Sequence, residues 1–185
     1  MKKKLKESAG VMLTVEPNLQ IMTDNMVSEW GGLPYPQLSV VLAHLKYLAE
    51  LHQYHHWTAM GDSYYGDHLL FQRLYQNVHP EIDSIAEKAI GLGCTDNVSI
   101  TLVNSQVLKL ITGQCSASTI PRSSDLARLS LKAEMNFLAA MKHLCESLKS
   151  SCLMTHGLDN LLAGIEDKHE GHVYLLKQRI SNPLV

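Results

Sequence analysis

The chain has 185 residues, of which 45% are hydrophobic and 18% charged, so it can fill one core well but is short for two. Its net charge of −2 argues against a surface generally coated with nucleic acid, and confines any DNA contact to a local patch. Four cysteines at irregular spacing fit reduced thiols better than a disulfide framework. We therefore expect a single cytoplasmic domain.

The first 35 residues read as a basic arm followed by an irregular extension. The arm carries four lysines: Lys2, Lys3, Lys4 and Lys6. The apolar run at 11–15 is far too short for a signal peptide core or a membrane span, so no membrane partner is expected. Prolines and glycines interrupt the pattern up to Tyr35, which predicts an extension laid over the main domain. The arm is either a solvated chain start or a DNA-binding segment, and the lysines alone leave both open.

Residues 36–185 carry the spacing of apolar residues that is typical of helices. Long helices are predicted at 36–61, 64–92, 124–154 and 158–180, with a short helix at 100–111 in the long crossover. Pro80 lies inside the second long helix and predicts a bend near 76–80, because proline removes a backbone hydrogen bond. Four long helices with one long crossover predict an all-α fold, a ferritin-like four-helix bundle.

Histidines and acids are concentrated between residues 52 and 87, at spacings that suit a metal ion. Asp83 and Glu87 lie one turn apart on one helix face and can share a cation, although an ordinary solvated acidic edge would look the same. His56 can approach His68 across an antiparallel helix pair. His68 and Asp83 are fifteen residues apart on one helix, a distance of roughly 22 Å. The two half-sites therefore need different copies of the chain, which a two-fold dimer provides.

The same stretch resembles the signature of the Dps family, the mini-ferritins named as DNA-binding proteins from starved cells. The matching residues, without gaps, are His56-Trp57, Gly61, His68, Phe71, Leu74-Tyr75, Asp83, Ala86-Glu87-Lys88 and Gly91-Leu92-Gly93. The resemblance implies that His56, His68, Asp83 and Glu87 are the catalytic iron ligands between two-fold related subunits. The family has an acid four residues after the second histidine, where this chain has Gln72.

The resemblance implies an iron-oxidising and iron-storing function. A Dps-like chain would bind and oxidise ferrous iron, prefer hydrogen peroxide, store ferric mineral in a hollow shell of twelve subunits, and protect DNA. Two imidazoles and two carboxylates suit iron and, less selectively, zinc or manganese. Gln72 and the basic arm favour an alternative, a nucleoid DNA-binding shell whose metal site is weak or vestigial. A structural shell that binds zinc at the same residues is the third interpretation.

Two further residues are expected to support the predicted site. His52 shares a helix face with His56, so it either fixes the tautomer of His56 or is a plain interface residue. Trp57 is expected to pack beside the metal.

A rival metal site inside one subunit would need two Glu-x-x-His motifs. Glu166 and His169 form one such motif, but the chain has no second motif of that kind. We therefore expect His169 and His172 at a helix surface or an interface, and His44 at a helix surface or the edge of the core.

Overall fold

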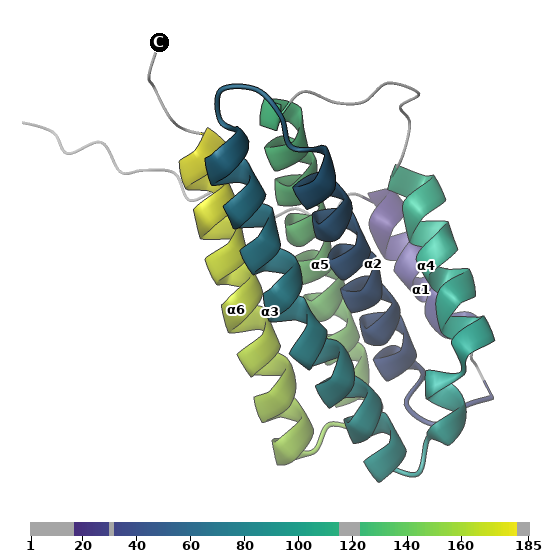
Figure 1. The fold of residues 1–185 in the computed structure, drawn as a ribbon. Coiled ribbons are helices and arrows are strands. Elements are labelled where there is room, and N and C mark those ends of the chain that lie inside the picture. Colours follow the sequence, from purple (N-terminus) through teal and green to yellow (C-terminus); the bar gives the residue numbers. More distant parts are fainter. Residues whose placement is uncertain (1–16, 30–31, 115–122, 181–185) are drawn as a thin grey trace, which may run out of the picture.

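The computed structural model describes residues 17–29, 32–114 and 123–180, and within these ranges every regular element is a helix (Figure 1). The elements are α1 (Pro17–Ser28), α2 (Pro36–Thr58), α3 (Tyr64–Gly91), the short 3-10 helix η1 (Thr95–Val98), α4 (Ile100–Gln114), α5 (Ser123–Ser150) and α6 (His156–Ile180). The four long helices α2, α3, α5 and α6 lie side by side, and α4 occupies the crossover between α3 and α5. The predicted all-α four-helix bundle is confirmed.

Helix α2 is the most deeply buried of the four, because α3, α5, α4 and α1 all pack against it. Between Leu38 and Ala49 every residue except Lys46 is buried. His44 belongs to this stretch and is 2% exposed, so the expectation of a position at the surface or core edge was wrong. Burial lowers the pKa of its imidazole to about 4, because the charged form is poorly solvated in the core.

The turn between α2 and α3 brings the end of one helix against the start of the next. Gly61 adopts a φ of 85° in this turn, a left-handed conformation that costs glycine no side-chain clash. Because the connection is short, α2 and α3 run antiparallel and make the most extensive helix contact in the bundle. His56, near the end of α2, is therefore carried toward His68 in the second turn of α3.

Pro80 lies within α3, which continues as one helix on both sides of it. Helix α3 is therefore continuous through 76–80, and the bend expected there stays a prediction. His68 and Asp83 therefore lie on one continuous helix, and the rise of that helix keeps the two predicted half-sites apart.

Helix α1 replaces part of the expected irregular extension. It packs against α2 and α5, and just beyond its end Glu29 pairs with Lys109 of α4 and accepts a hydrogen bond of 2.8 Å from Gln106. The buried side of α1 is narrow, comprising Thr23 and Met26, so hydrophobic spacing was too sparse to predict it. The lysines of the arm lie outside the described residues.

The crossover helix α4 covers α2 on the side away from α3 and α6 (Figure 1). It leaves large apolar side chains in solvent, with Ile100 76% and Leu108 60% exposed. Nowhere in the described part of the chain is a helix both long enough and apolar enough to cross a lipid bilayer.

Candidate metal centre

His56 and His68 meet at the surface where α2 ends and α3 begins. Their rings stack with centroids 3.7 Å apart and planes at 26°. Each Nδ1 pairs with the main-chain carbonyl of the other residue, at 2.9 Å for His56 and 3.0 Å for His68. Both Nδ1 atoms therefore donate, which leaves Nε2 of each ring as the nitrogen able to bind a cation. The expected approach of His56 to His68 is confirmed.

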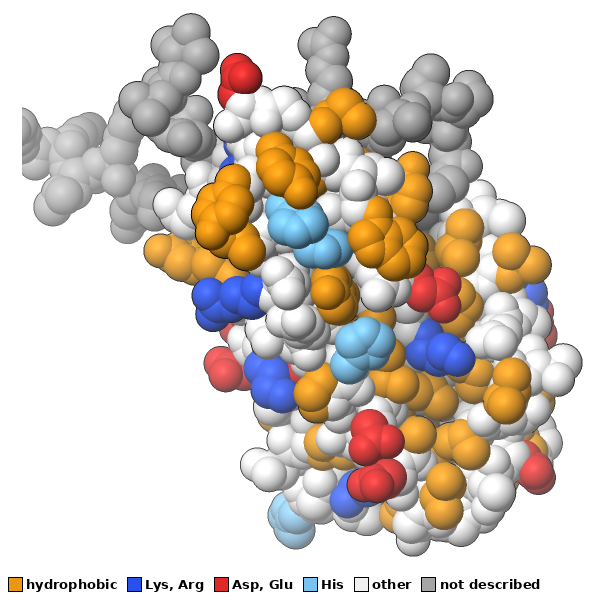
Figure 2. Space-filling model, in the orientation of Figure 1, with side chains coloured by type: hydrophobic (Ala, Val, Ile, Leu, Met, Phe, Trp, Pro, Cys, Tyr) orange, Lys and Arg blue, Asp and Glu red, His pale blue; other side chains and the backbone are white. Residues whose placement is uncertain are grey.

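Asp83 and Glu87 lie further along α3, exposed and one turn apart. Because α3 is continuous, the rise of about 1.5 Å per residue separates them from His68 by roughly 22 Å or more. Figure 2 shows histidine side chains on the upper part of this face and a pair of acidic side chains on its lower part. One subunit therefore keeps its two half-sites apart, as the spacing predicted.

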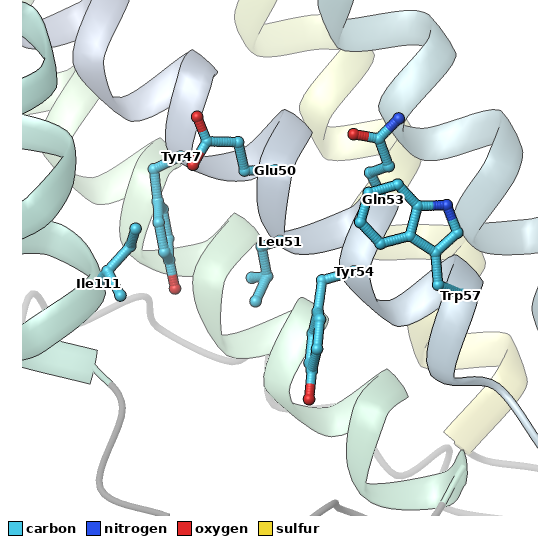
Figure 3. A pocket seen from close by; sticks show the side chains of 7 residues that line it. All are labelled: Tyr47, Glu50, Leu51, Gln53, Tyr54, Trp57 and Ile111. Atoms are coloured by element: carbon cyan, nitrogen blue, oxygen red, sulfur yellow. The ribbon is translucent and has the colours of Figure 1, made fainter.

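Gln72 and Trp57 flank the histidine pair. Gln72 is half-buried on α3. Trp57 is 68% exposed and lines an open groove of about 380 Å³ between α2 and α4. The groove is shown in Figure 3, with Ile111 of α4 at one end and Trp57 at the other. Most of the Trp57 side chain is therefore exposed in the single subunit, and its packing beside a metal stays a prediction.

His52 does not partner His56, so its expected role in fixing the tautomer of that residue was wrong. It is fully buried, and its Nε2 lies 2.7 Å from Oε1 of Glu134 while its Nδ1 lies 3.2 Å from the Ser130 hydroxyl. His55 also reaches the Ser130 hydroxyl, at 2.7 Å. Because α2 is buried on several sides, the residues one turn before His56 enter the bundle interior.

A second histidine and carboxylate cluster occupies that interior. His169 and His172 of α6 are 0% and 2% exposed, so the expectation that they lie at a surface or interface was wrong. His169 places Nδ1 2.5 Å from Glu134 and Nε2 2.9 Å from Glu81, and His172 Nδ1 lies 3.1 Å from Glu134. Glu134, His169 and His172 each offer a ligand atom within 4.8 Å of the others. These three residues could hold a metal ion within one subunit.

The charges in this cluster follow from its contacts. Burial alone raises the pKa of the Glu134 carboxyl, but the charge of His169 and the hydrogen bonds from the three histidines hold it well below its ordinary value. Burial likewise opposes protonation of His169, yet Glu134 and Glu81 raise the pKa of His169 to about 9. Burial lowers the pKa of His52 and outweighs the attraction of Glu134. At neutral pH the cluster therefore contains ionised Glu134, cationic His169 and neutral His52.

Sequence reasoning missed Glu81 and Glu134, which are 2% and 0% exposed. Glu166, the acid of the Glu-x-x-His motif, is half-buried, and burial raises the pKa of its carboxyl. The signal that could have found Glu134 is its position on the helix. It lies on the apolar face of α5, between Ala133 and Phe137, where a charged residue is unusual.

Comparison with known proteins supports the fold. No protein-family model and no curated protein matches the chain. DpsC from Streptomyces coelicolor aligns with a TM-score of 0.70 and 16% identity, over 100% of this chain and 99% of that one. Dps from Thermosynechococcus elongatus aligns with a TM-score of 0.69 and 15% identity, over 91% and 99%.

A third structure links the fold to a wider group. The Dps protein from Vibrio cholerae O1 aligns with a TM-score of 0.66 and 14% identity, over 94% of this chain and 100% of that one. It is described as a member of a broad superfamily of ferritin-like diiron-carboxylate proteins. At these identities the likeness concerns the fold, and this chain has the Dps fold, an all-α ferritin-like bundle.

Proposed function

We propose that this chain is a Dps-type mini-ferritin of the cytoplasm. It binds ferrous iron between two-fold related subunits, oxidises it with hydrogen peroxide, and stores ferric mineral in a hollow shell of twelve subunits. Removal of iron and peroxide protects DNA. The observation that carries this proposal is the stacked pair His56 and His68, held at the surface with both Nδ1 atoms engaged and far along α3 from Asp83 and Glu87 of the same chain.

The register of α3 supports a composite site. His68 lies nine residues before Asn77, and Glu87 lies nine residues after Val78. An antiparallel pairing of α3 with α3 of the partner subunit, centred between Asn77 and Val78, places His68 opposite Glu87 of the partner subunit. Gln72 and Asp83 are likewise five residues from this centre, so the same register sets Gln72 opposite Asp83 of the partner subunit.

Exposed apolar side chains supply a surface for such a partner. Trp57, next to His56, is 68% exposed, and Tyr64 and Leu69 beside His68 are each 45% exposed. Clusters of large apolar side chains on a protein surface mark contact sites between proteins. Trp57 lies at the end of the groove in Figure 3, so a second subunit that covers the histidine pair would also reach this end of the groove.

In the proposed site the two imidazoles hold ferrous iron without adding charge, and the carboxylates favour the ferric product because a trivalent ion gains most from anionic oxygen. Glu87 binds or bridges iron directly, and Asp83 is the fourth ligand. Gln72 accepts a hydrogen bond but brings no charge, so the second iron position is weaker than it would be with an acid.

Oxidation of ferrous iron by purified shells tests the assignment. His68→Ala and Glu87→Ala should each slow the reaction at limiting iron by at least about tenfold, because each removes a ligand. His79→Ala is the matched control, since His79 is exposed on the same helix outside the proposed quartet. Parental rates in either ligand variant would contradict the proposal.

Mixed shells test whether the site spans two subunits. A shell assembled from equal amounts of His68→Ala and Glu87→Ala subunits pairs an intact histidine half with an intact acid half in about a quarter of its two-fold sites. Such shells should recover about a quarter of the parental activity. If all ligands came from one chain, mixing would restore nothing.

A further inference from the structure

Five ionisable side chains meet inside the bundle, and the proposed surface site uses none of them. His52 comes from α2, Glu81 from α3, Glu134 from α5, and His169 and His172 from α6, and each is at most 2% exposed. Burying charged groups is costly unless they are paired or bind a metal. Apolar side chains would fill the same core at a lower free-energy cost, so stability alone does not explain why these residues are present.

The three imidazoles have the same arrangement of partners: one ring nitrogen contacts Glu134, and the other contacts a second polar side chain. The inner atoms are His169 Nδ1 at 2.5 Å, His52 Nε2 at 2.7 Å and His172 Nδ1 at 3.1 Å from the carboxylate. The outer atoms face Glu81 at 2.9 Å for His169, Ser130 at 3.2 Å for His52 and Asn77 at 3.3 Å for His172. Metal-binding histidines are held in this way, because a second partner fixes the ring and its tautomer.

Glu81 provides an independent indication that the cluster is incomplete. Its Oε2 pairs with His169, but its buried Oε1 accepts no hydrogen bond in the structure. The ammonium of Lys168 lies 3.3 Å from Oε1 without the geometry of a hydrogen bond, and that side chain is 55% exposed. A buried carboxylate oxygen is therefore left without a hydrogen-bond donor, which is expected where a core cluster is arranged to take up an ion.

We propose that each subunit binds one divalent transition-metal cation at this centre. The ligands are Glu134, His169 and His172, whose donor atoms lie within 4.8 Å of one another, and His52, which contacts the same carboxylate, is the fourth. Glu81 positions the ring of His169. Three imidazoles and one carboxylate suit zinc or ferrous iron, whereas magnesium and calcium prefer oxygen ligands. Around a cation with bonds of about 2.0 to 2.2 Å, each imidazole nitrogen would separate slightly from the Glu134 oxygen that it now contacts, and His52 would move toward the other two imidazoles.

Four protein ligands make a closed site, which is typical of structural metals. The cation would join α2, α5 and α6 directly and α3 through Glu81. Its expected effect is to stabilise the bundle, and this effect is separate from iron turnover at the surface.

The experiment uses the full chain with both surface histidines removed, His56→Ala/His68→Ala, so that the proposed surface site cannot supply the signal. Shells stripped with a chelator are loaded with zinc, cobalt or, without oxygen, ferrous iron, and then desalted. One cation per subunit should be retained, the melting temperature should rise, and cobalt should show the intense visible absorption of a four-coordinate ion. No retained cation, or an unchanged melting temperature, would overturn the proposal.

Variants added to this background locate the cation. His169→Gln and His52→Gln should each weaken retention by at least about tenfold. His44→Gln should not, although His44 is an equally buried histidine on the same helix as His52. Equal retention in all three variants would contradict the assigned ligands. Should both ligand variants lose helicity, the cobalt spectrum of the parent background decides, since the weak absorption of a six-coordinate ion would exclude the site.

Discussion

The two histidine clusters of this chain are built in opposite ways. His56 and His68 lie at the surface, each bound to the main chain of the other, whereas His169 lies in the core between Glu81 and Glu134. At the surface, solvent screens the charges and a partner can complete the set. In the core, every charge must be matched within the subunit, because water cannot solvate it. The surface pair is therefore suited to a ligand that exchanges with solvent, and the core cluster to permanent stability.

The largest expected effect comes from removing the central charge of the core cluster. Glu134→Gln leaves the His169 imidazolium without one of its two anions, which should cost about 3 to 5 kcal/mol, or roughly 6 to 20 °C in melting temperature. Calorimetry of chelator-treated shells at matched concentration measures this. Glu87→Gln, at an exposed position on α3, should change stability by less than about 0.5 kcal/mol. Equal losses in both variants would remove the distinction between the clusters.

A buried histidine without an acid should behave differently from His169. The pKa of His44 in the fold is about 4, below the ordinary value of about 6.5. Its contribution to stability is therefore complete above pH 6.5 and is lost as pH falls toward 4, because the unfolded chain binds the extra proton. His44→Leu should reduce the acid sensitivity of the melting temperature by an amount equivalent to about 1 to 3 kcal/mol. His79→Leu, at an exposed position, serves as the control, and the same pH profile in all three proteins would contradict this account.

A smaller effect should sharpen the account of the surface site. Gln72→Asp places a carboxylate where this chain has a neutral amide, and one added charge near a cation is worth about 1 kcal/mol or more, or at least about fivefold in affinity. Iron titration of stripped shells should therefore show a tighter second iron position. Gln76→Asp, the same change one turn further along α3, should leave the titration unaltered. An unchanged stoichiometry with Gln72→Asp would argue against the proposed role of this position.

The smallest effect per subunit concerns DNA. One arm with Lys2, Lys3, Lys4 and Lys6 neutralises at most four phosphates, which gives a salt slope of about −3.6 on a logarithmic scale. Many arms on one shell would raise the total affinity by multivalency. Gel shifts at several salt concentrations should show sequence-independent binding that is lost when residues 1–8 are removed, while iron oxidation survives. Equal DNA mobility with both proteins at the lowest salt would eliminate protection by direct binding.

The sequence by itself determined the helices and the surface pair, because both depend on short-range spacing. Apolar residues at helical intervals predicted the long helices and the crossover helix, and the short turn at Gly61 implied that His56 would approach His68. Helix α1 was missed because its buried side is narrow. Both are local properties, because the 3.6-residue spacing of apolar side chains can be recognised within a few turns of sequence.

Only the tertiary structure decided the core cluster. Its members are spread from His52 to His172, with Glu81 and Glu134 in separate helices between them, and no sequence motif joins them. Whether a histidine faces solvent or the bundle depends on the rotation of its helix against three neighbours. His169 and His172 looked like surface residues because most ionisable side chains are exposed. Packing of α6 against α3 and α5 placed them instead beside Glu81 and Glu134.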